Sequence, residues 1–142
     1  MTIYAISIAS NLDKALNTQL ALNALQQLGK LKISKIYQIP CRDGVGADYW
    51  NWACLLESQQ SVEDIDALLK AMELATGRKR PSHKISLDID LIAWGEDLQH
   101  MQFNAKKLPL ADDVIIPMQD IWTLQDQQIE HSYPNFCQTI LG

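Results

Sequence analysis

The segment that most constrains the fold of this chain runs from Ser86 to Trp94 and reads SLDIDLIAW, an apolar run with two aspartates two residues apart. Successive side chains of a β-strand point to opposite faces, so a strand here places Asp88 and Asp90 together on one face and Ile89 on the other. The leucines on either side alternate in step with Ile89. The pattern therefore predicts a strand with one face in a hydrophobic core and a pair of carboxylates on the opposite face.

A pair of ionised carboxylates needs a positive partner, because the two charges repel each other and neither tolerates burial alone. Mg²⁺ is a suitable partner, since proteins hold it with one or two carboxylates while substrate phosphates and waters complete its shell. The simpler alternative is an exposed strand face with two solvated acids. Residues 77–84 (GRKRPSHK) favour the metal, because they hold four of the twelve Lys and Arg residues. Cations next to metal-binding carboxylates predict a site for a metal polyphosphate.

The composition restricts the class of protein. A chain of 142 residues with 47% hydrophobic and 20% charged residues can bury one core, so we expect a single domain over residues 1–142. The net charge of -5 predicts no general attraction to nucleic acid. Because no apolar run is long enough to span a bilayer and the start lacks a signal-peptide pattern, we expect no membrane partner and a cytoplasmic location. The odd number of cysteines, three, fits reduced thiols in a cytoplasm.

Hydrophobic periodicity predicts four strands and two helices along the chain. The strands are expected over residues 2–8, 31–39, 49–57 and 86–94, and the helices over residues 13–28 and 61–76. We expect Asn11 to cap the first helix, Gly29 to end it, and its buried stripe to include Leu16 and Leu20. Ser61 opens the second helix as an N-cap, and a glycine ends it.

The order strand, helix, strand, strand, helix, strand predicts a ferredoxin-like α+β sandwich, in which helices back an antiparallel sheet. The remaining residues form a C-terminal extension, where we expect a short helix through residues 114–116. In this order we expect the first and fourth strands to lie centrally. Ser10 and Asn11 are then predicted to share a cleft with Asp88 and Asp90.

The start of the third strand combines aromatic rings with an amide. Tyr49 and Asn51 share one face of this strand, and Trp50 and Trp52 share the other. Aromatic residues at the mouth of a strand most often pack against the core or its rim. An amide beside rings can also bind the edge of a flat heterocycle while the rings stack on its face. Both interpretations stay open, rim packing and a pocket for a nitrogenous ring.

Taken in order, five motifs resemble 6-hydroxymethyl-7,8-dihydropterin pyrophosphokinase, the folate-pathway enzyme that moves the β,γ-diphosphate of ATP onto a pterin hydroxymethyl group. They are Ser10-Asn11-Leu12, Tyr37 with Pro40, Asp48-Tyr49-Trp50-Asn51, Glu73-Leu74 with Gly77-Arg78, and Leu87-Asp88-Ile89-Asp90-Leu91-Ile92 with Trp94-Gly95. The last motif is the most specific. The resemblance covers residues 3–95 and implies an ATP-dependent diphosphotransferase of folate biosynthesis.

The resemblance also implies roles for individual residues. They are metal binding and catalysis for Asp88 and Asp90, phosphate charge for Arg78 and Arg80, nucleotide binding for Glu73 and Lys84, and pterin binding for Pro40, Tyr49 and Asn51. The two aspartates would hold two Mg²⁺ ions that bridge the ATP phosphates. Mg²⁺ is then the cofactor and ATP the co-substrate, and we expect a monomer whose partners are these small molecules.

The chain departs from the family's pattern where the family places functional residues. Ala9 stands where the family has a glycine, and Ile39 where it has a threonine. Ile85 replaces an arginine, with Lys84 beside it as a substitute, and a lysine is a poorer bidentate clamp on phosphate than an arginine. Leu110 replaces the histidine of the family's Pro-His signature, and the last third of the chain contains no arginine.

These departures leave two alternatives to an efficient enzyme. The first is a catalytically weakened or inactive homologue that still binds pterin or nucleotide and has a regulatory role. The second is a metal-dependent hydrolase of another polyphosphate, which would use Asp88 and Asp90 but would not need Tyr49 and Asn51. The paired aspartates with Asn51 favour diphosphate transfer over both.

Overall fold

The computed structural model describes residues 1–41, 44–79, 82 and 84–123. Within them, six strands, three α-helices and one 3₁₀ turn follow one another along the chain. The elements are β1 (Thr2–Ser10), α1 (Lys14–Gln26), β2 (Lys30–Ile33), β3 (Tyr37–Ile39), β4 (Tyr49–Ser58), α2 (Val62–Ala75), β5 (Asp88–Gly95), β6 (Met101–Phe103), η1 (Ala105–Lys107) and α3 (Asp112–Met118).

All strand pairs are antiparallel, and the sheet has the order β2-β4-β1-β5-β6, with β3 also paired to β4. The predicted α+β class and ferredoxin-like arrangement are confirmed. β6, which was not predicted, covers the outer edge of β5 and makes it an interior strand. β1 lies at the middle of the sheet, between β4 and β5, so the face of β1 can act together with both neighbours.

The strand predicted over residues 31–39 is two strands. Ser34 still pairs with β4, because its N–H donates to the Ala53 carbonyl at 2.9 Å and its Oγ accepts from the Ala53 N–H at 2.8 Å. The next residue, Lys35, instead donates its backbone N–H to the Asp120 carboxylate at 3.1 Å. A side chain far along the chain thus takes the backbone donor of Lys35, and regular pairing resumes only at Tyr37.

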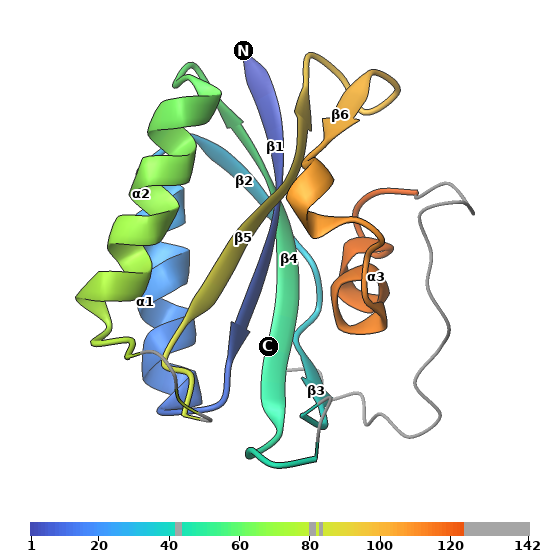
Figure 1. Ribbon diagram of the computed structural model, residues 1–142. Helices are drawn as coiled ribbons and strands as arrows, with labels where there is room; N and C mark the ends of the chain where they lie inside the picture. Colours follow the sequence, from blue (N-terminus) through green and yellow to red (C-terminus); the bar gives the residue numbers. More distant parts are fainter. Residues whose placement is uncertain (42–43, 80–81, 83, 124–142) are drawn as a thin grey trace.

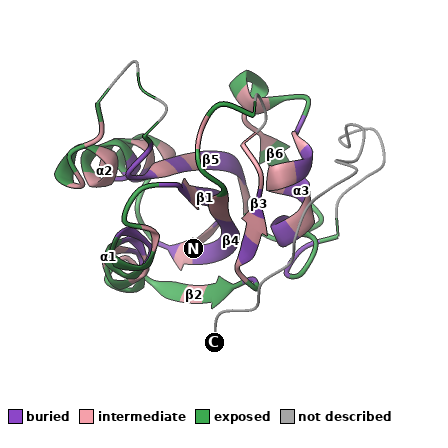
Figure 2. Ribbon diagram, turned by 90° about the horizontal axis from the view of Figure 1, so that it is seen from below, coloured by how far each residue is buried: buried purple, intermediate pink, exposed green. Residues whose placement is uncertain are grey.

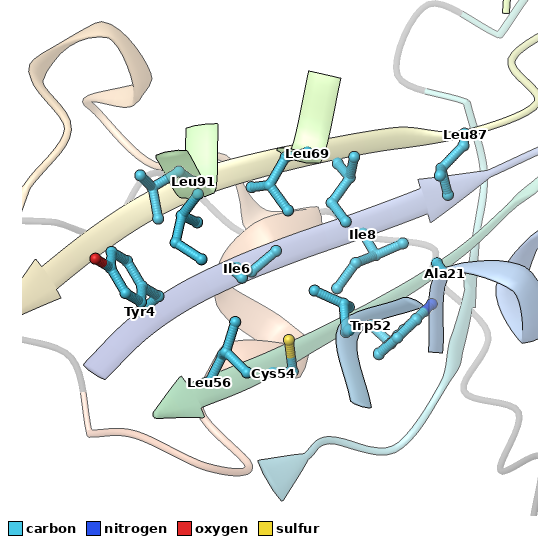
Figure 3. Packing of buried hydrophobic residues seen from close by; sticks show 13 residues of the cluster. Tyr4, Ile6, Ile8, Ala21, Trp52, Cys54, Leu56, Leu69, Leu87 and Leu91 are labelled. Atoms are coloured by element: carbon cyan, nitrogen blue, oxygen red, sulfur yellow. The ribbon is translucent and has the colours of Figure 1, made fainter. Parts of the chain in front are cut away.

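The sheet separates two hydrophobic cores. Helices α1 and α2 cover one face and α3 lies against the other (Figure 1). On the helix-covered face, β1, β4 and β5 contribute alternating side chains, and Figure 3 shows this packing around Ile6, Trp52 and Leu69. The second core lies between the sheet and α3 and includes Ile115 and Met118. The alternation along the first half of β5 therefore buries Ile89 and Leu91 in the first core and turns Asp88 and Asp90 to the opposite face.

The predicted buried stripe of α1 is confirmed at Leu25, which is fully buried, but is wrong in the first turns of the helix. Leu16 and Leu20 are 61% and 46% exposed, while the buried positions include Asn17 and Ala21. Asn17 turns inward because its amide donates to the Leu12 carbonyl at 2.7 Å, and this bond sets the rotation of the helix against the sheet. The outward face of α1 is correspondingly exposed in Figure 2.

The ends of the helices follow different rules. Ser61 caps α2 as predicted, since its Oγ accepts from the Asp64 N–H at 3.1 Å, and Gly77 follows the helix with a φ of +80°. Asn11 does not cap α1, because the N-cap position is Asp13, which has no side-chain cap bond. Gly29 is required by close packing, because a Cβ atom there would lie 2.0 Å from the Glu57 carbonyl oxygen.

No helix in the part of the chain that the structure describes is both long enough and apolar enough to cross a membrane.

Candidate active site

Strands β1, β4 and β5 place three polar positions side by side on the face that α3 partly covers. Ala9 of β1 pairs with Asn51 of β4 on one side and with Asp88 of β5 on the other, and Ser7 of β1 pairs with Asp90. Residues paired across antiparallel strands share a face, so these side chains project together. The amide and both carboxylates therefore open into the same space.

That space is a cavity of about 470 Å³ between the sheet and the segment from η1 to α3. The sheet side is lined by Ser7, Ala9, Tyr49, Asn51, Asp88, Asp90 and Ile92, and the facing wall by Lys106, Lys107, Pro109, Ala111, Asp113 and Val114. Cys41, which follows β3, also lines the cavity. A cavity of this size is in the range of small-molecule sites in proteins. Its chemistry is divided, with an aromatic ring and an amide on β4 and a pair of carboxylates on β5.

The acid pair on β5 is partly exposed and already has two cationic partners. The side chains of Asp88 and Asp90 are 39% and 28% exposed. Arg78 places a guanidinium nitrogen 3.4 Å from Asp88, and Lys107 places its Nζ 2.8 Å from Asp90. Each aspartate thus has one cationic partner, Arg78 for Asp88 and Lys107 for Asp90.

Arg78 belongs to a network that joins the end of α2 to the start of β5. Its guanidinium donates to Glu73 at 3.2 Å and to the Leu87 carbonyl at 2.9 Å, besides its contact with Asp88. Glu73 in turn accepts from the Ile89 N–H at 3.1 Å. Because the Arg78 side chain is only 9% exposed, the network fixes the position of Asp88 from behind the cavity.

The surroundings of both aspartates disfavour the ionised form, so the pKa of each carboxyl group is raised. Burial raises the pKa of Asp88, the nearby Arg78 lowers it, and the carboxylate of Glu73 raises it again, so the net direction is upward. Burial also raises the pKa of Asp90, and the charge of Asp88 adds to this, against the opposing effect of Lys107. The pair thus favours any arrangement that brings further positive charge to it.

Lys107 is the site residue that the sequence patterns did not reveal. It closes the 3₁₀ turn η1, which is attached to β5 through Asn104: the Asn104 amide donates to the Leu91 carbonyl at 2.9 Å and its N–H to the Ile92 carbonyl at 2.8 Å. This attachment brings Lys107 over Asp90. A turn of three residues has neither strand nor helix periodicity, so the only local signal was Asn104, whose Oδ1 accepts from the Lys106 N–H as a cap.

Asn51 lines the cavity with a buried side-chain amide that, in the part of the chain that the structure describes, has an unused hydrogen-bond donor. The residue is only 4% exposed, and its Nδ2 atom has no hydrogen-bond partner among the described residues. A buried amide donor without a partner costs about 1–3 kcal/mol, so a ligand that accepts a hydrogen bond there is favoured. Tyr49, two residues earlier on the same face, is half-buried and lines the same cavity.

A comparison with protein families matches residues 5–125 to 7,8-dihydro-6-hydroxymethylpterin-pyrophosphokinase (HPPK). The chain belongs to the HPPK family. Members are ATP-dependent pyrophosphokinases that transfer a pyrophosphoryl group from ATP to hydroxymethyldihydropterin in folate synthesis, so the predicted family, activity and substrates are confirmed at this level. The match extends through β6, η1 and α3, beyond the residues 3–95 on which the motifs lie.

Of the four residues at which the sequence is expected to depart from the family's pattern, Ala9 lines the cavity and Ile39, Ile85 and Leu110 do not. Ile85 is 8% exposed, and its N–H donates to Asn11 Oδ1 at 2.6 Å. Leu110 is 1% exposed and packs in the core beneath α3. Both side chains are therefore structural in this HPPK, whereas the methyl group of Ala9 lies in the cavity wall between Asn51 and Asp88.

The other predicted site residues that the structure describes, Pro40 and Lys84, do not line the cavity. Pro40 does not line the cavity, although its neighbour Cys41 does. Lys84 is exposed and outside the lining, and Arg80 lies outside the described residues. The cleft predicted for Ser10 and Asn11 is wrong. Ser10 pairs with Trp50 and so belongs to the opposite face of β1, and residues 7 and 9 of that strand face the aspartates instead.

Proposed function

We propose that this chain is a functional HPPK in which one cavity binds the pterin at its β4 end and the ATP phosphates at its β5 end. The observation that carries the proposal is the placement of Asn51, Asp88 and Asp90 on one sheet face in one cavity. An unsatisfied buried amide suits the edge of a pterin ring, and a carboxylate pair suits a metal polyphosphate.

The donor set fits Mg²⁺. Carboxylate oxygens are hard ligands, the two aspartates share a face, and both are open enough to solvent for an ion to reach them. We propose that Asp88 and Asp90 hold the metal, which when bound neutralises charge on the transferred phosphates. Arg78 keeps Asp88 in position from the side away from the cavity.

The remaining residues bind and orient. Asn51 donates from its free amide hydrogen to an acceptor on the pterin ring, and Tyr49 packs on the face of the ring. In the reaction the hydroxymethyl oxygen of the pterin forms a bond to the β-phosphorus of ATP. The bond from that phosphorus to the oxygen of the α-phosphate breaks, AMP leaves with the electron pair, and the hydroxyl proton passes to solvent. Positioning and charge neutralisation supply the catalysis, so no covalent enzyme intermediate is needed.

We also propose that residues 1–142 act as a single domain, as a monomer and in the cytoplasm. The three cysteines and the folate-pathway substrates support a reducing, metabolic compartment.

A second candidate is a homologue that binds pterin or nucleotide but no longer transfers diphosphate. The observation that favours it is the burial of Ile85 and Leu110, because the positions where the family has charged or ionisable side chains add nothing to the cavity here. The first candidate binds pterin and ATP and transfers diphosphate, whereas the second binds pterin or nucleotide without transfer and has a regulatory role.

Calorimetric titration distinguishes the two candidates. The purified chain is titrated with Mg²⁺ and a non-hydrolysable ATP analogue, then with 6-hydroxymethylpterin, and AMP release is measured on the same sample. Binding of both ligands with AMP release supports the functional enzyme. Binding of one or both ligands without AMP release supports the second candidate.

Two substitutions test the assignment of residues. Asp90→Ala is expected to abolish transfer with little loss of folding, and Asn51→Ala to weaken pterin binding more than nucleotide binding. Asp66→Ala and Asn23→Ala are matched controls, because both residues lie on exposed helix surfaces. Transfer that survives in Asp90→Ala would refute the metal role. An equal loss of both ligands in Asn51→Ala would indicate structural damage instead of a lost contact.

A further inference from the structure

Lys107 lies in the cavity with a defined anchor and a defined partner. Its Nζ donates to Asp90 Oδ1 at 2.8 Å, and 37% of its side chain is exposed, so the ammonium group is in contact with both the carboxylate and the open cavity. The backbone that carries it is held to β5 by the two hydrogen bonds of Asn104. The position of the residue is therefore fixed, while the long side chain can still rotate.

The Lys107 ammonium group competes with a divalent cation for Asp90, because it lies 2.8 Å from Oδ1, closer than the 3.4 Å between Arg78 and Asp88. The two positive charges at about 4 Å would repel each other with an energy of several kcal/mol at the effective dielectric constant of a protein surface. If Asp90 binds a metal, this repulsion favours movement of Lys107 away from it. Asp88 offers no replacement, because Arg78 already contacts that carboxylate.

The ligand that brings the metal also brings new anions. A metal polyphosphate places phosphate oxygens around the metal, within reach of a flexible lysine whose backbone stays above β5. Lys106, the preceding residue, lines the same wall of the cavity. This wall thus contributes two lysines to the cavity and belongs to the third of the chain that has no arginine.

We propose that Lys107 is an exchangeable counterion. In the free protein it neutralises Asp90, and on binding of the metal and nucleotide it transfers to the phosphate oxygens of ATP. The proposal rests on the proposed function, since it requires a metal at Asp90 and a nucleotide beside it. It makes Lys107 a substrate-binding residue of this enzyme and assigns to η1 the phosphate contact.

Exchange predicts effects of opposite sign on two affinities. Removing the ammonium group removes the competitor for Asp90, so metal alone binds more tightly. It also removes a phosphate contact, so nucleotide binds less tightly in the presence of metal. A residue with a merely structural role would weaken both or change neither. We expect each change to be about two- to fivefold, because a partly exposed charge interaction contributes up to about 1 kcal/mol.

The experiment uses the full chain with Lys107→Met, which keeps the apolar stem and removes the charge. Mn²⁺ alone is the first probe, followed by electron paramagnetic resonance. A non-hydrolysable ATP analogue in saturating Mg²⁺ is the second, followed by calorimetry. Lys70→Met is the matched control, because Lys70 forms an exposed ion pair with Asp66 at 2.9 Å on α2. Lys107→Arg tests whether charge alone restores nucleotide binding.

Tighter Mn²⁺ binding with weaker nucleotide binding in Lys107→Met, and neither change in Lys70→Met, would support exchange. Unchanged or weaker Mn²⁺ binding in Lys107→Met would overturn it while leaving the metal site of the proposed function intact. A separate result would show failure of the proposed function: Asp90→Asn and the unmodified chain binding Mn²⁺ equally. Circular dichroism on each variant shows that the comparisons are between folded proteins.

Discussion

Tyr37 joins two distant parts of the chain through a single side chain. Its hydroxyl donates to the Asp120 carboxylate, with oxygen separations of 3.0 and 2.9 Å, and the residue is 5% exposed. Asp120 also accepts from the Lys35 N–H. Burial, together with the hydrogen bond and negative charge of Asp120, raises the pKa of Tyr37 to about 12. The residue thus links the region of β3 to the end of α3 as long as its phenol stays protonated.

This raised pKa predicts a loss of stability at high pH. Between its ordinary pKa of 10.0 and about 12, the unfolded phenol has lost its proton while the folded one keeps it. The unfolded state then binds fewer protons, so the free energy of unfolding falls as the pH rises. The contribution of Tyr37 is about 1–3 kcal/mol. Urea unfolding from pH 9 to pH 11.5 measures it.

Tyr37→Phe isolates this contribution from other groups that titrate in the same range, such as Tyr4, whose pKa burial also raises. At pH 9 we expect the variant to be less stable by about 1 kcal/mol, the value of one hydrogen bond. The difference between the two proteins should shrink as the pH rises. A constant difference across the range would mean that Tyr37 does not keep its proton preferentially in the folded state.

At the scale of residues, the alternation of side chains along β-strands predicted which residues share a face of the sheet. The shared face of Asp88 and Asp90 and the orientation of Asn51 follow from alternation along β-strands, and the structure confirms both orientations. Lys107 could not be predicted in this way, because its place depends on Asn104 bonds to a strand more than ten residues earlier. The orientation of Ser10 could have been predicted, because it differs by one position from residues that do face the aspartates.

At the scale of elements, α2 has strong local signals of a helix at its start and along its buried face. It begins at a serine cap, carries Glu63 and Asp64 in its first turn and buries Ile65 and Leu69. Acidic side chains near a helix N-terminus interact favourably with the helix dipole. Sequence and packing therefore agree for this element, and its boundaries were predicted closely.

Ser61→Ala is expected to lower the free energy of unfolding by about 1 kcal/mol, because the Asp64 N–H loses its acceptor. Pterin affinity should not change, since the cap is at the opposite end of α2 from Glu73 and Arg78. Chemical denaturation and pterin titration measure the two quantities. Ser61→Asp is the control, because aspartate is an equally good cap. If Ser61→Asp is destabilised as much as Ser61→Ala, the serine acts through something other than capping.

The other elements show where local signals stop. In the first turns of α1 the leucines at helical spacing predicted the wrong buried face, because the inward bond of Asn17 outweighs their pattern. The split between β2 and β3 depends on Asp120, more than eighty residues away. β6 has three residues, too few for a periodic pattern, and exists because β5 offers an edge to pair with. The failures at β2, β3 and β6 have their cause in a tertiary contact, whereas the bond of Asn17 to Leu12 spans only five residues.

At the scale of the whole molecule, the sheet separates a core that only stabilises the fold from a core that also borders the cavity. The core between the sheet and the helices α1 and α2 contains no side chain that lines the cavity. The core beneath α3 is different, because the residues on either side of Leu110, Pro109 and Ala111, form part of the cavity wall. A defect in the first core should therefore cost stability alone, and a defect in the second should also alter the site.

Leu69→Ala and Leu110→Ala make this comparison with the same chemical change at equal burial, since each leucine is 1% exposed. Truncation of a buried leucine removes favourable contacts and leaves a void, so we expect each variant to lose about 2–5 kcal/mol of unfolding free energy. Only Leu110→Ala should also bind pterin more weakly, because the wall formed by its neighbours loses its support. Denaturation midpoints and pterin titration under folding conditions measure the two effects.

The pterin affinities of the two variants show which core supports the cavity. Equal pterin affinity in both variants would mean that the wall is supported by α3 itself, independently of Leu110. Weaker binding in Leu69→Ala would mean that the sheet transmits strain between its faces, because a side chain on the helix-covered side can then move Asn51. A loss of binding confined to Leu110→Ala would mean that the Leu110 side chain supports the cavity wall formed by Pro109 and Ala111 from within the core.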